Sequence, residues 1–400
     1  MRIALASLLI LITTIGCGDD TGGGKSGGGG GGGSAALPDV IRIGHYGSMT
    51  GPTATFGTST DEGIHLALDE INGGNGDKAE GVLGKKVEVR TEDDQGKPTE
   101  AVNAVEKLIN RDKVVAVLGE VASSNSLAAA PVCQSAGVPM LTPASTNPKV
   151  TQTGDFIFRS CFIDPFQGGV MAKFALNELK AKKFAVLYDV NSDYSQGLRQ
   201  FFTEEVKRGG GTIVADEAYS QTDVDFRGQL TKIKNAAPDA IYVPGYYTQV
   251  GAICRQAKEL GISAPLLGGD GWDSDKLFEI GGETVNDNYF TNHYSIEEQR
   301  PEVQKFVADY RKKYNGKTPD AMAILGYDAM KLMADAITRA GSVDGRKIAD
   351  ALAATKNFPG ASGAITIDAD RNAQKPIVIL KIVPGKTPAE RTKFVTSIKP

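Results

Sequence analysis

The sequence predicts an α/β protein of two lobes, each a parallel sheet flanked by helices. Short apolar segments alternate with segments whose apolar residues recur every three or four positions. Such strand–helix alternation is typical of parallel sheets with helices on both faces. The alternation runs from about residue 41 to 143 and restarts at 184, so two sheets are expected. The 363 residues from Pro38 onward are also enough for two domains of ordinary size.

The first series of elements begins with an alternating strand at 41–46. Further strands are expected at 86–93, 114–119 and 139–143. A helix with Ile64, Leu68 and Ile71 on one face follows the first strand. Pro98 opens a second helix, and residues 124–136 form a third.

The second series has strands expected at 184–188, 212–214, 240–243 and 265–268. Helices are expected near 196–207, 226–235 and 249–260. The order again alternates, so this half predicts a second parallel sheet.

The N-terminal region reads as an export signal over residues 1–16 and a glycine-rich tether over 17–37. Arg2 precedes an uncharged apolar run at 3–15, which is too short to span a membrane. Gly16 directly before Cys17 resembles a bacterial lipobox, although Thr14 stands where leucine is usual. The resemblance implies a lipid on Cys17 that anchors the chain to a membrane; the alternative is plain secretion with Cys17 as a thiol.

The glycine run contains Gly-Gly-Gly-Lys-Ser, which invites comparison with a phosphate-binding loop. That motif needs a glycine five residues before its Gly-Lys pair, and Asp19 occupies the position. The stretch also lacks a preceding strand and a following helix. A flexible tether is therefore the better interpretation.

Composition narrows the class of protein. The chain has 41% hydrophobic and 23% charged residues and a net charge of −4, without a basic stripe, so no nucleic-acid partner is expected. After Cys17 only Cys133, Cys161 and Cys254 remain. An odd number of cysteines in an exported chain leaves at least one thiol unpaired within the chain, and the pairing of the others is open.

The candidate site follows from a rule about parallel sheets: ligands bind beyond the carboxyl ends of the strands. The loops at those ends are 48–52, 120–126, 143–147, 191–194, 245–249 and 269–273. Ser123 and Ser124 lie at a helix start, where free N–H groups favour a carboxylate. Asp270 supplies the negative charge that an ammonium needs. Together they suit a zwitterion such as an α-amino acid, although each alone is also an ordinary helix cap.

These loops carry a resemblance to the leucine/isoleucine/valine-binding proteins of ABC transporters, over about residues 41–379. It rests on ordered matches that include Thr50-Gly-Pro, Leu141-Thr-Pro-Ala-Ser-Thr, Phe158 to Gly168, Asp193-Tyr-Ser-Gln-Gly and Gly269-Asp-Gly-Trp-Asp. The resemblance implies the type I periplasmic binding protein fold with three hinge crossings. Lobe 1 would comprise 38–161 and 291–367, and lobe 2 would comprise 162–290 and 368–400. It also implies a monomer on the extracytoplasmic side of a bacterial membrane, with an ABC permease as partner.

The same resemblance assigns roles to individual residues. The ligand carboxylate would be held by Ser123 and Thr146, and its ammonium by Ala144, Thr146 and Asp270. Tyr194 and Tyr246 would close over the ligand. Phe56 stands by the side-chain pocket where the family has tyrosine, and Trp272 either narrows that pocket or packs between lobes. Asp270 replaces the family's usual glutamate, which leaves the preferred side chain open beyond a neutral aliphatic, branched-chain type.

Two other functions, catalysis and sensing, fit the sequence less well. Catalysis is disfavoured because His45, His65 and His293 lack zinc-ligand spacing and no nucleophile elbow occurs, so no cofactor and no metal are expected. Asp93 and Asp94 are interpreted as solvated strand-end or hinge-side carboxylates rather than as a catalytic dyad. A sensor that binds an amino acid or small amide and signals is the second alternative, disfavoured because no signalling domain is attached.

Overall fold

The computed structural model describes residues 37–73 and 81–400. The signal segment, Cys17 and nearly all of the tether lie outside the described residues. Within the described part of the chain the strands form sheets of five, seven and three strands. None of the helices there is long and apolar enough to cross a membrane.

The first sheet has the order β2-β1-β3-β4-β5, and all its strands are parallel. Its strands are β1 (Val40–Gly47), β2 (Lys86–Asp93), β3 (Ala116–Leu118), β4 (Met140–Thr142) and β5 (Ile157–Arg159). The four strands predicted in this half are confirmed. The edge strand β5 was missed because its three residues include the charged Arg159, whereas the equally short β3 and β4 carry no charge.

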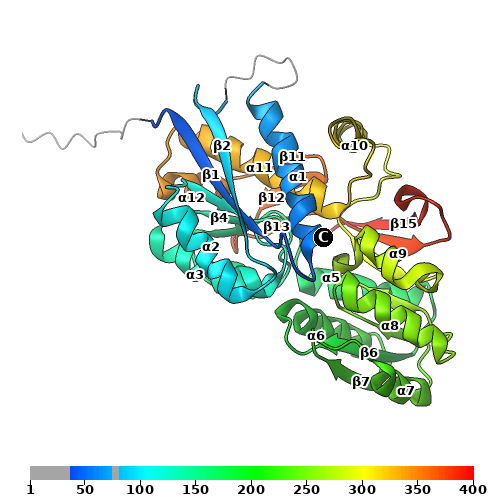
Figure 1. Cartoon of the computed structure of the whole chain (residues 1–400). Coiled ribbons are helices and arrows are strands. Elements are labelled where there is room, and N and C mark those ends of the chain that lie inside the picture. The colour runs from blue at the N-terminus through cyan, green and yellow to red at the C-terminus, as the bar shows by residue number, and fades with distance from the viewer. Residues whose placement is uncertain (1–36, 74–80) are drawn as a thin grey trace, which may run out of the picture. The chain divides into compact units, whose positions relative to one another are not determined.

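Helices cover both faces of the first sheet (Figure 1). Ile41 and Ile43 of β1 point into one core with α1 (Ala54–Ile71) and α11 (Ala321–Ala340). Tyr46, on the opposite face, packs with α2 (Pro98–Asn110) and α3 (Ser123–Ala136). Side chains alternate between faces along a strand, so this alternation is what the hydrophobic pattern of 41–46 encodes.

The second sheet has the order β15-β14-β10-β9-β8-β6-β7. Its strands are β6 (Lys183–Asp189), β7 (Thr212–Tyr219), β8 (Ala240–Tyr242), β9 (Leu266–Gly268), β10 (Tyr289–Asn292), β14 (Ile377–Ile382) and β15 (Thr392–Ile398). The strands β6 to β10 are parallel, but β14 and β15 are antiparallel, so the expectation of a wholly parallel sheet is corrected. The chain leaves the sheet at Asn292, the last residue of β10, and re-enters it at the same end, where Val378 of β14 pairs with Asn292. Because β14 starts where β10 ends, the two strands run in opposite directions.

Apolar residues of the second sheet and of its helices pack together in one core. The helices are α5 (Asp164–Asn177), α6 (Asp193–Arg208), α7 (Arg227–Ala236), α8 (Tyr247–Glu259) and α9 (Asp275–Gly281). The three helices predicted here correspond to α6, α7 and α8, with ends that differ by one to three residues.

The remaining elements return to the first core. They are α4 (Lys149–Gln152), α10 (Pro301–Lys313), α12 (Gly345–Ala353), β11 (Phe358–Gly360), β12 (Gly363–Ile367) and β13 (Ala373–Gln374). The short 3-10 turns η1 (Asp270–Trp272) and η2 (Gly282–Val285) belong to the second core, and η3 (Pro388–Glu390) lies between β14 and β15. Phe306, Ile337 and Ile365 all pack with the first sheet. The chain thus passes between the two cores near residues 160–163, 293–300 and 375–376.

The cysteines of the described region settle the pairing that the sequence left open. Cys133, Cys161 and Cys254 are all buried and free. Burial raises the pKa of each thiol to about 12, so none is a reactive thiolate at neutral pH.

Candidate functional site

The helix starts at the strand ends of the two sheets face each other. Helix α3 begins at Ser123, as the sequence predicts to within one residue, and α6 begins at Asp193. Ser124 Oγ lies 2.9 Å from Asp193 Oδ2, and the Asn147 side-chain amide donates to the Asp193 carbonyl at 2.8 Å. The predicted serine and threonine loops are therefore in direct contact with the second sheet's helices.

A buried carboxyl fixes the serine loop. Glu120 accepts hydrogen bonds from Ser48 N at 3.1 Å, from Ser48 Oγ at 2.9 Å and from Ala122 N. Burial, and then repulsion from nearby Asp94, raises the pKa of Glu120 well above its usual value. Asp94 is itself fully buried and accepts from Ser48 Oγ at 3.0 Å, so its prediction as a solvated carboxylate is wrong.

A buried arginine fixes the threonine loop. The Arg159 guanidinium donates to the carbonyl of Asn147 at 2.7 Å, to the carbonyl of Ser145, and to Asn372 Oδ1 at 2.7 Å. These bonds clamp both sides of Thr146, whose own hydroxyl remains available. They also tie the loop to the chain segment near the third passage between the cores.

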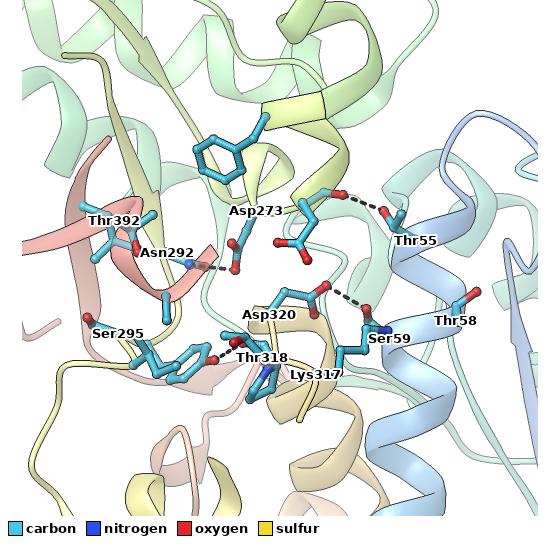
Figure 2. Close-up of a pocket in the computed structure, with 18 of the residues that line it drawn as sticks. Thr55, Thr58, Ser59, Asp273, Asn292, Ser295, Lys317, Thr318, Asp320 and Thr392 are labelled. Atoms are coloured by element: carbon cyan, nitrogen blue, oxygen red, sulfur yellow. Dashed lines mark hydrogen bonds between the residues drawn. The ribbon is translucent and has the colours of Figure 1, made fainter. Parts of the chain in front are cut away.

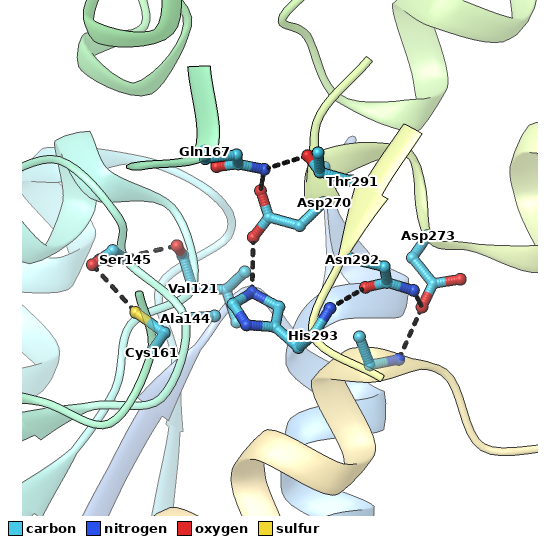
Figure 3. Close-up of polar contacts among 12 residues, drawn as sticks. Val121, Ala144, Ser145, Cys161, Gln167, Asp270, Asp273, Thr291, Asn292 and His293 are labelled. Atoms are coloured by element: carbon cyan, nitrogen blue, oxygen red, sulfur yellow. Dashed lines mark hydrogen bonds and ion pairs between the residues drawn. The ribbon is translucent and has the colours of Figure 1, made fainter. Parts of the chain in front are cut away.

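Asp270 lies where the second sheet approaches the first, at the start of η1. Its Oδ1 accepts from Gln167 Nε2 at 2.7 Å and from the Tyr194 hydroxyl at 2.9 Å. Its Oδ2 lies 3.0 Å from His293 Nε2, and Figure 3 shows the carboxylate between Gln167 and His293. Three donors therefore hold this carboxylate in one orientation.

Aromatic side chains from both lobes cover the region. Tyr194 and Tyr246 stack with centroids 5.2 Å apart, and Phe56 of α1 meets Tyr246 edge-on at 5.6 Å. Trp272 does not cover this region. Its indole N–H donates to the Val243 carbonyl at 3.0 Å, and its ring stacks on Phe290 in the second core.

All eight predicted ligand residues are at most 8% exposed. The structure brings together Ser123, Ala144, Thr146, Tyr194, Tyr246, Asp270 and Phe56. Several buried polar atoms in this neighbourhood have no hydrogen-bond partner among the described residues: Thr146 Oγ1, Asp164 Oδ1 and Oδ2, Gln167 Oε1, Tyr242 Oη and His293 Nδ1. Buried polar groups are nearly always paired in proteins, so this concentration marks where a polar ligand fits.

The electrostatics of the site suit a charged ligand. Burial raises the pKa of Asp164 to about 8, with smaller effects from Thr146, Asp270 and Arg159. Burial lowers the pKa of His293, so the imidazole is neutral at pH 7. The described residues contain no group of three or more metal-ligating side chains placed to hold an ion.

A separate cavity of about 220 Å³ lies between α1, α9 and the start of α11 (Figure 2). None of the eight predicted ligand residues lines it. Its two central acids serve the fold: Asp320 accepts from Ser59 at 2.7 Å, and Asp273 accepts from Asn292 at 2.9 Å and from Ala321 N at 2.7 Å. These bonds join the second sheet to helix α11 of the first core.

Sequence reasoning missed Asp164, Gln167, Arg159 and His293, whereas Asn147 lies in the predicted loop 143–147. The first three lie in the Phe158–Gly168 stretch, which was used only as a family match. His293 follows a parallel strand end, but β10 was not predicted, so its loop was not considered.

Two α/β cores, joined by three chain passages and enclosing buried polar atoms at facing helix starts, define a binding protein that encloses a small polar ligand. The chain belongs to the periplasmic binding protein family, whose model matches residues 40–387. That family is extracytoplasmic, and the fold is its type I form.

Individual relatives agree with this assignment. The chain is 33% identical to the Leu/Ile/Val-binding protein BraC3 of Rhizobium johnstonii over 82% of this chain and 87% of that protein. The crystal structure of a leucine-binding protein LivK from Thermotoga maritima has a TM-score of 0.84 at 43% identity, covering 90% of this chain and 99% of that one. The crystal structure of the branched-chain amino acid transporter substrate binding protein LivJ from Streptococcus pneumoniae, in complex with isoleucine, has a TM-score of 0.82 at 34% identity, covering 90% of this chain and 100% of that one.

Proposed function

We propose that this protein captures a neutral aliphatic amino acid, of branched-chain type, and delivers it to an ABC permease. The proposal rests on one observation: groups that favour an anion and a carboxylate that favours a cation lie on opposite sides of one buried site. The start of α3, which includes Ser123, and the Thr146 loop lie on one side, and the Asp270 carboxylate lies on the other. Relatives named for leucine, isoleucine and valine support the same class of ligand.

In this proposal the ligand carboxylate accepts hydrogen bonds from Ser123, Thr146 and the free N–H groups of α3. A helix start favours an anion because its N–H groups are unpaired and its dipole is positive there. The ammonium faces Asp270 and the Ala144 carbonyl. Phe56, Tyr194 and Tyr246 enclose the aliphatic part and exclude water.

The two cores, joined by passages near residues 160–163, 293–300 and 375–376, are proposed to act as lobes that close on the ligand; the third passage lies later than the 367/368 boundary expected from the sequence. Ser124 with Asp193, and Phe56 with Tyr246, are contacts that only a closed arrangement provides. A ligand that touches both lobes stabilises the closed form, because it binds that form better than an open one. The permease would recognise the closed surface.

The protein is proposed to act as a monomer, tethered to the membrane by a lipid on Cys17, and to release its ligand unchanged. In this role the site residues hold, enclose and release the ligand, and they carry out no chemical step on it.

A thermal-shift screen against common amino acids tests the proposal. Leucine, isoleucine and valine are expected to stabilise the protein most, by about 2.7 kcal/mol at 100 times the dissociation constant. Sugars, nucleotides and metal ions serve as controls. Stabilisation by a control class, with none by any amino acid, would overturn the proposed function.

A further inference from the structure

Asp273 directly follows the η1 turn, three residues after Asp270, in the proposed second lobe. Its Oδ2 accepts a hydrogen bond from the backbone N–H of Ala321 at 2.7 Å. Ala321 is the first residue of α11, a 20-residue helix that packs in the first core. A carboxylate of one lobe therefore occupies the start of a helix of the other lobe.

The contact satisfies a group that α11 cannot satisfy by itself. The first N–H groups of an α-helix have no partner within the helix, and the positive end of its dipole favours a carboxylate. The helix also has a cap from its own lobe, because Asp320 Oδ1 accepts from Ala323 N at 3.0 Å. The start of α11 keeps that cap without Asp273, so the Asp273 contact serves the junction of the lobes rather than the helix.

A chain of hydrogen bonds links Asp273 to Asp270 (Figure 3). Asn292 Nδ2 donates to Asp273 Oδ2 at 2.9 Å, and Asn292 Oδ1 accepts from the His293 backbone N–H at 2.9 Å. His293 Nε2 lies 3.0 Å from Asp270 Oδ2. The two neighbouring residues Asn292 and His293 thus hold both the carboxylate in the proposed ligand site and the carboxylate that contacts α11.

A second contact between the lobes lies beside this one. Thr55 Oγ1 of α1 is 2.9 Å from the Oγ of Ser274, the residue after Asp273. Thr55, Asp273 and Ser274 all line the cavity of about 220 Å³ in Figure 2. The cavity is a gap in the packing between the lobes, and hydrogen bonds bridge the lobes at its edge.

We propose that Asp273 is an interlobe latch, which holds the start of α11 in the closed arrangement and so slows the release of a ligand that it does not touch. This inference rests on the proposed function and adds a positioning residue outside the ligand site. The balance between closed and open forms depends on the contacts that only one of them makes. Loss of the Asp273 contact should therefore favour the open form, while the contacts to the ligand itself stay in place.

The test removes the contact from each lobe in turn. D273A deletes the acceptor in the second lobe. A321P deletes the N–H donor in the first lobe, at the first helical position, where proline is favoured. Asp320 before it already has the extended backbone that a following proline needs, with φ −86° and ψ −178°.

Binding is measured with L-leucine, or with the amino acid ranked first in the screen. Calorimetry should show an affinity roughly 10-fold lower, or lower still, in each variant, and stopped-flow kinetics should assign the loss chiefly to faster dissociation. The double variant D273A/A321P should lose little more than either single variant, because both changes remove the same contact.

D344A is the matched control. Asp344 Oδ1 accepts from Lys347 N at 3.1 Å and caps α12 within the first lobe, so D344A loses a helix cap but no interlobe contact. It should keep the affinity of the parent.

Lobe separation is measured by pulsed EPR between spin labels on T99C and Q200C, one exposed site in each lobe. The labels are introduced in the C17S background, where the remaining thiols are buried. With saturating ligand the parent and D344A should show one short distance. D273A and A321P should keep a longer distance as well.

Parental affinity in either D273A or A321P overturns the inference and leaves the proposed function intact. Lower affinity with the parental lobe distance also overturns it, because Asp273 would then act within the second lobe alone. Where D273A does not fold, A321P decides by the same two measurements. A parent protein that binds no amino acid overturns the proposed function, and the latch with it.

Discussion

His293 Nε2 lies 3.0 Å from Asp270 Oδ2, and the imidazole stacks on Phe162 with centroids 3.9 Å apart. His293 follows β10 on one of the passages between the cores. Phe162 lies on another passage, next to Cys161 of the first lobe. The orientation of the Asp270 carboxylate thus depends on two of the segments that connect the cores.

Replacement of His293 should weaken ligand binding through Asp270. H293A removes the donor to Oδ2 and should cost about 1–2 kcal/mol of binding free energy, about 5- to 30-fold in affinity. H293Q can present an amide N–H near the same point and should recover most of the loss. Titration calorimetry on both variants checks this order. Equal losses in the two variants would show that the imidazole serves packing rather than positioning.

Removal of charge from the site should cost more than removal of a hydroxyl. D270N is expected to lose about 2–5 kcal/mol of binding free energy, because the ligand ammonium keeps less compensation in a buried site. S123A should lose about 1 kcal/mol, because the N–H groups at the start of α3 still hold the carboxylate. Calorimetry with the best ligand measures both. D270N binding as tightly as the parent would remove Asp270 from the ammonium subsite.

Ligand binding should release a proton near neutral pH. The pKa of Asp164 is about 8, raised chiefly by burial, so its carboxyl holds a proton at pH 7. An ammonium beside it favours the ionised form and lowers this pKa. Affinity should therefore rise with pH from about 6 to 8, by up to about tenfold per unit, and level off above the pKa.

The groups that face Asp164 are Thr146, Asn147, Asp270, Arg159 and Tyr242. His293 stays neutral because burial lowers its pKa. Calorimetry in buffers of different ionisation enthalpy counts the released proton. D164N should abolish the release, and an unchanged release in D164N would assign the proton to another group.

A glycine at the crossing of α1 and α11 should be sensitive to any side chain. A Cβ atom at Gly63 would lie 1.8 Å from the Ala323 carbonyl oxygen. G63A must separate the two helices and should lower the free energy of unfolding by about 2 kcal/mol or more. G228A, in α7 with open space around its Cβ position, is the matched control and should be neutral or slightly stabilising. Denaturant unfolding compares the two.

The proposed anchor is separable from ligand binding. C17S should move the protein from the membrane fraction to the soluble extracytoplasmic fraction, because the lipid attachment point is lost. Ligand affinity should not change, because no residue of the site belongs to the tether. Retention of C17S in the membrane fraction would contradict the lipobox interpretation.

The sequence by itself determined the repeating elements of both halves. Strands such as β1 and β2 and helices such as α2 and α6 carry a regular apolar period, which follows from local geometry and needs no knowledge of the partner segments. The start of α3 near Ser123 and the place of Asp270 at a strand end also follow, because ligand loops lie at the carboxyl ends of parallel strands.

Only the tertiary structure decided the rest. The strands β5 and β10 mix apolar residues with Arg159 or Asn292 and so lack the apolar character of equally short strands such as β3 and β8. The strand β14 pairs antiparallel with both β10 and β15, because the chain returns beside its point of departure. The burial of Asp94 and of Asp164 depends on segments distant in the sequence. Gln167 and Asp270 meet across 103 positions. A residue's type fixes which hydrogen bonds it can make, but the neighbours that satisfy them are set by which segments the fold brings together.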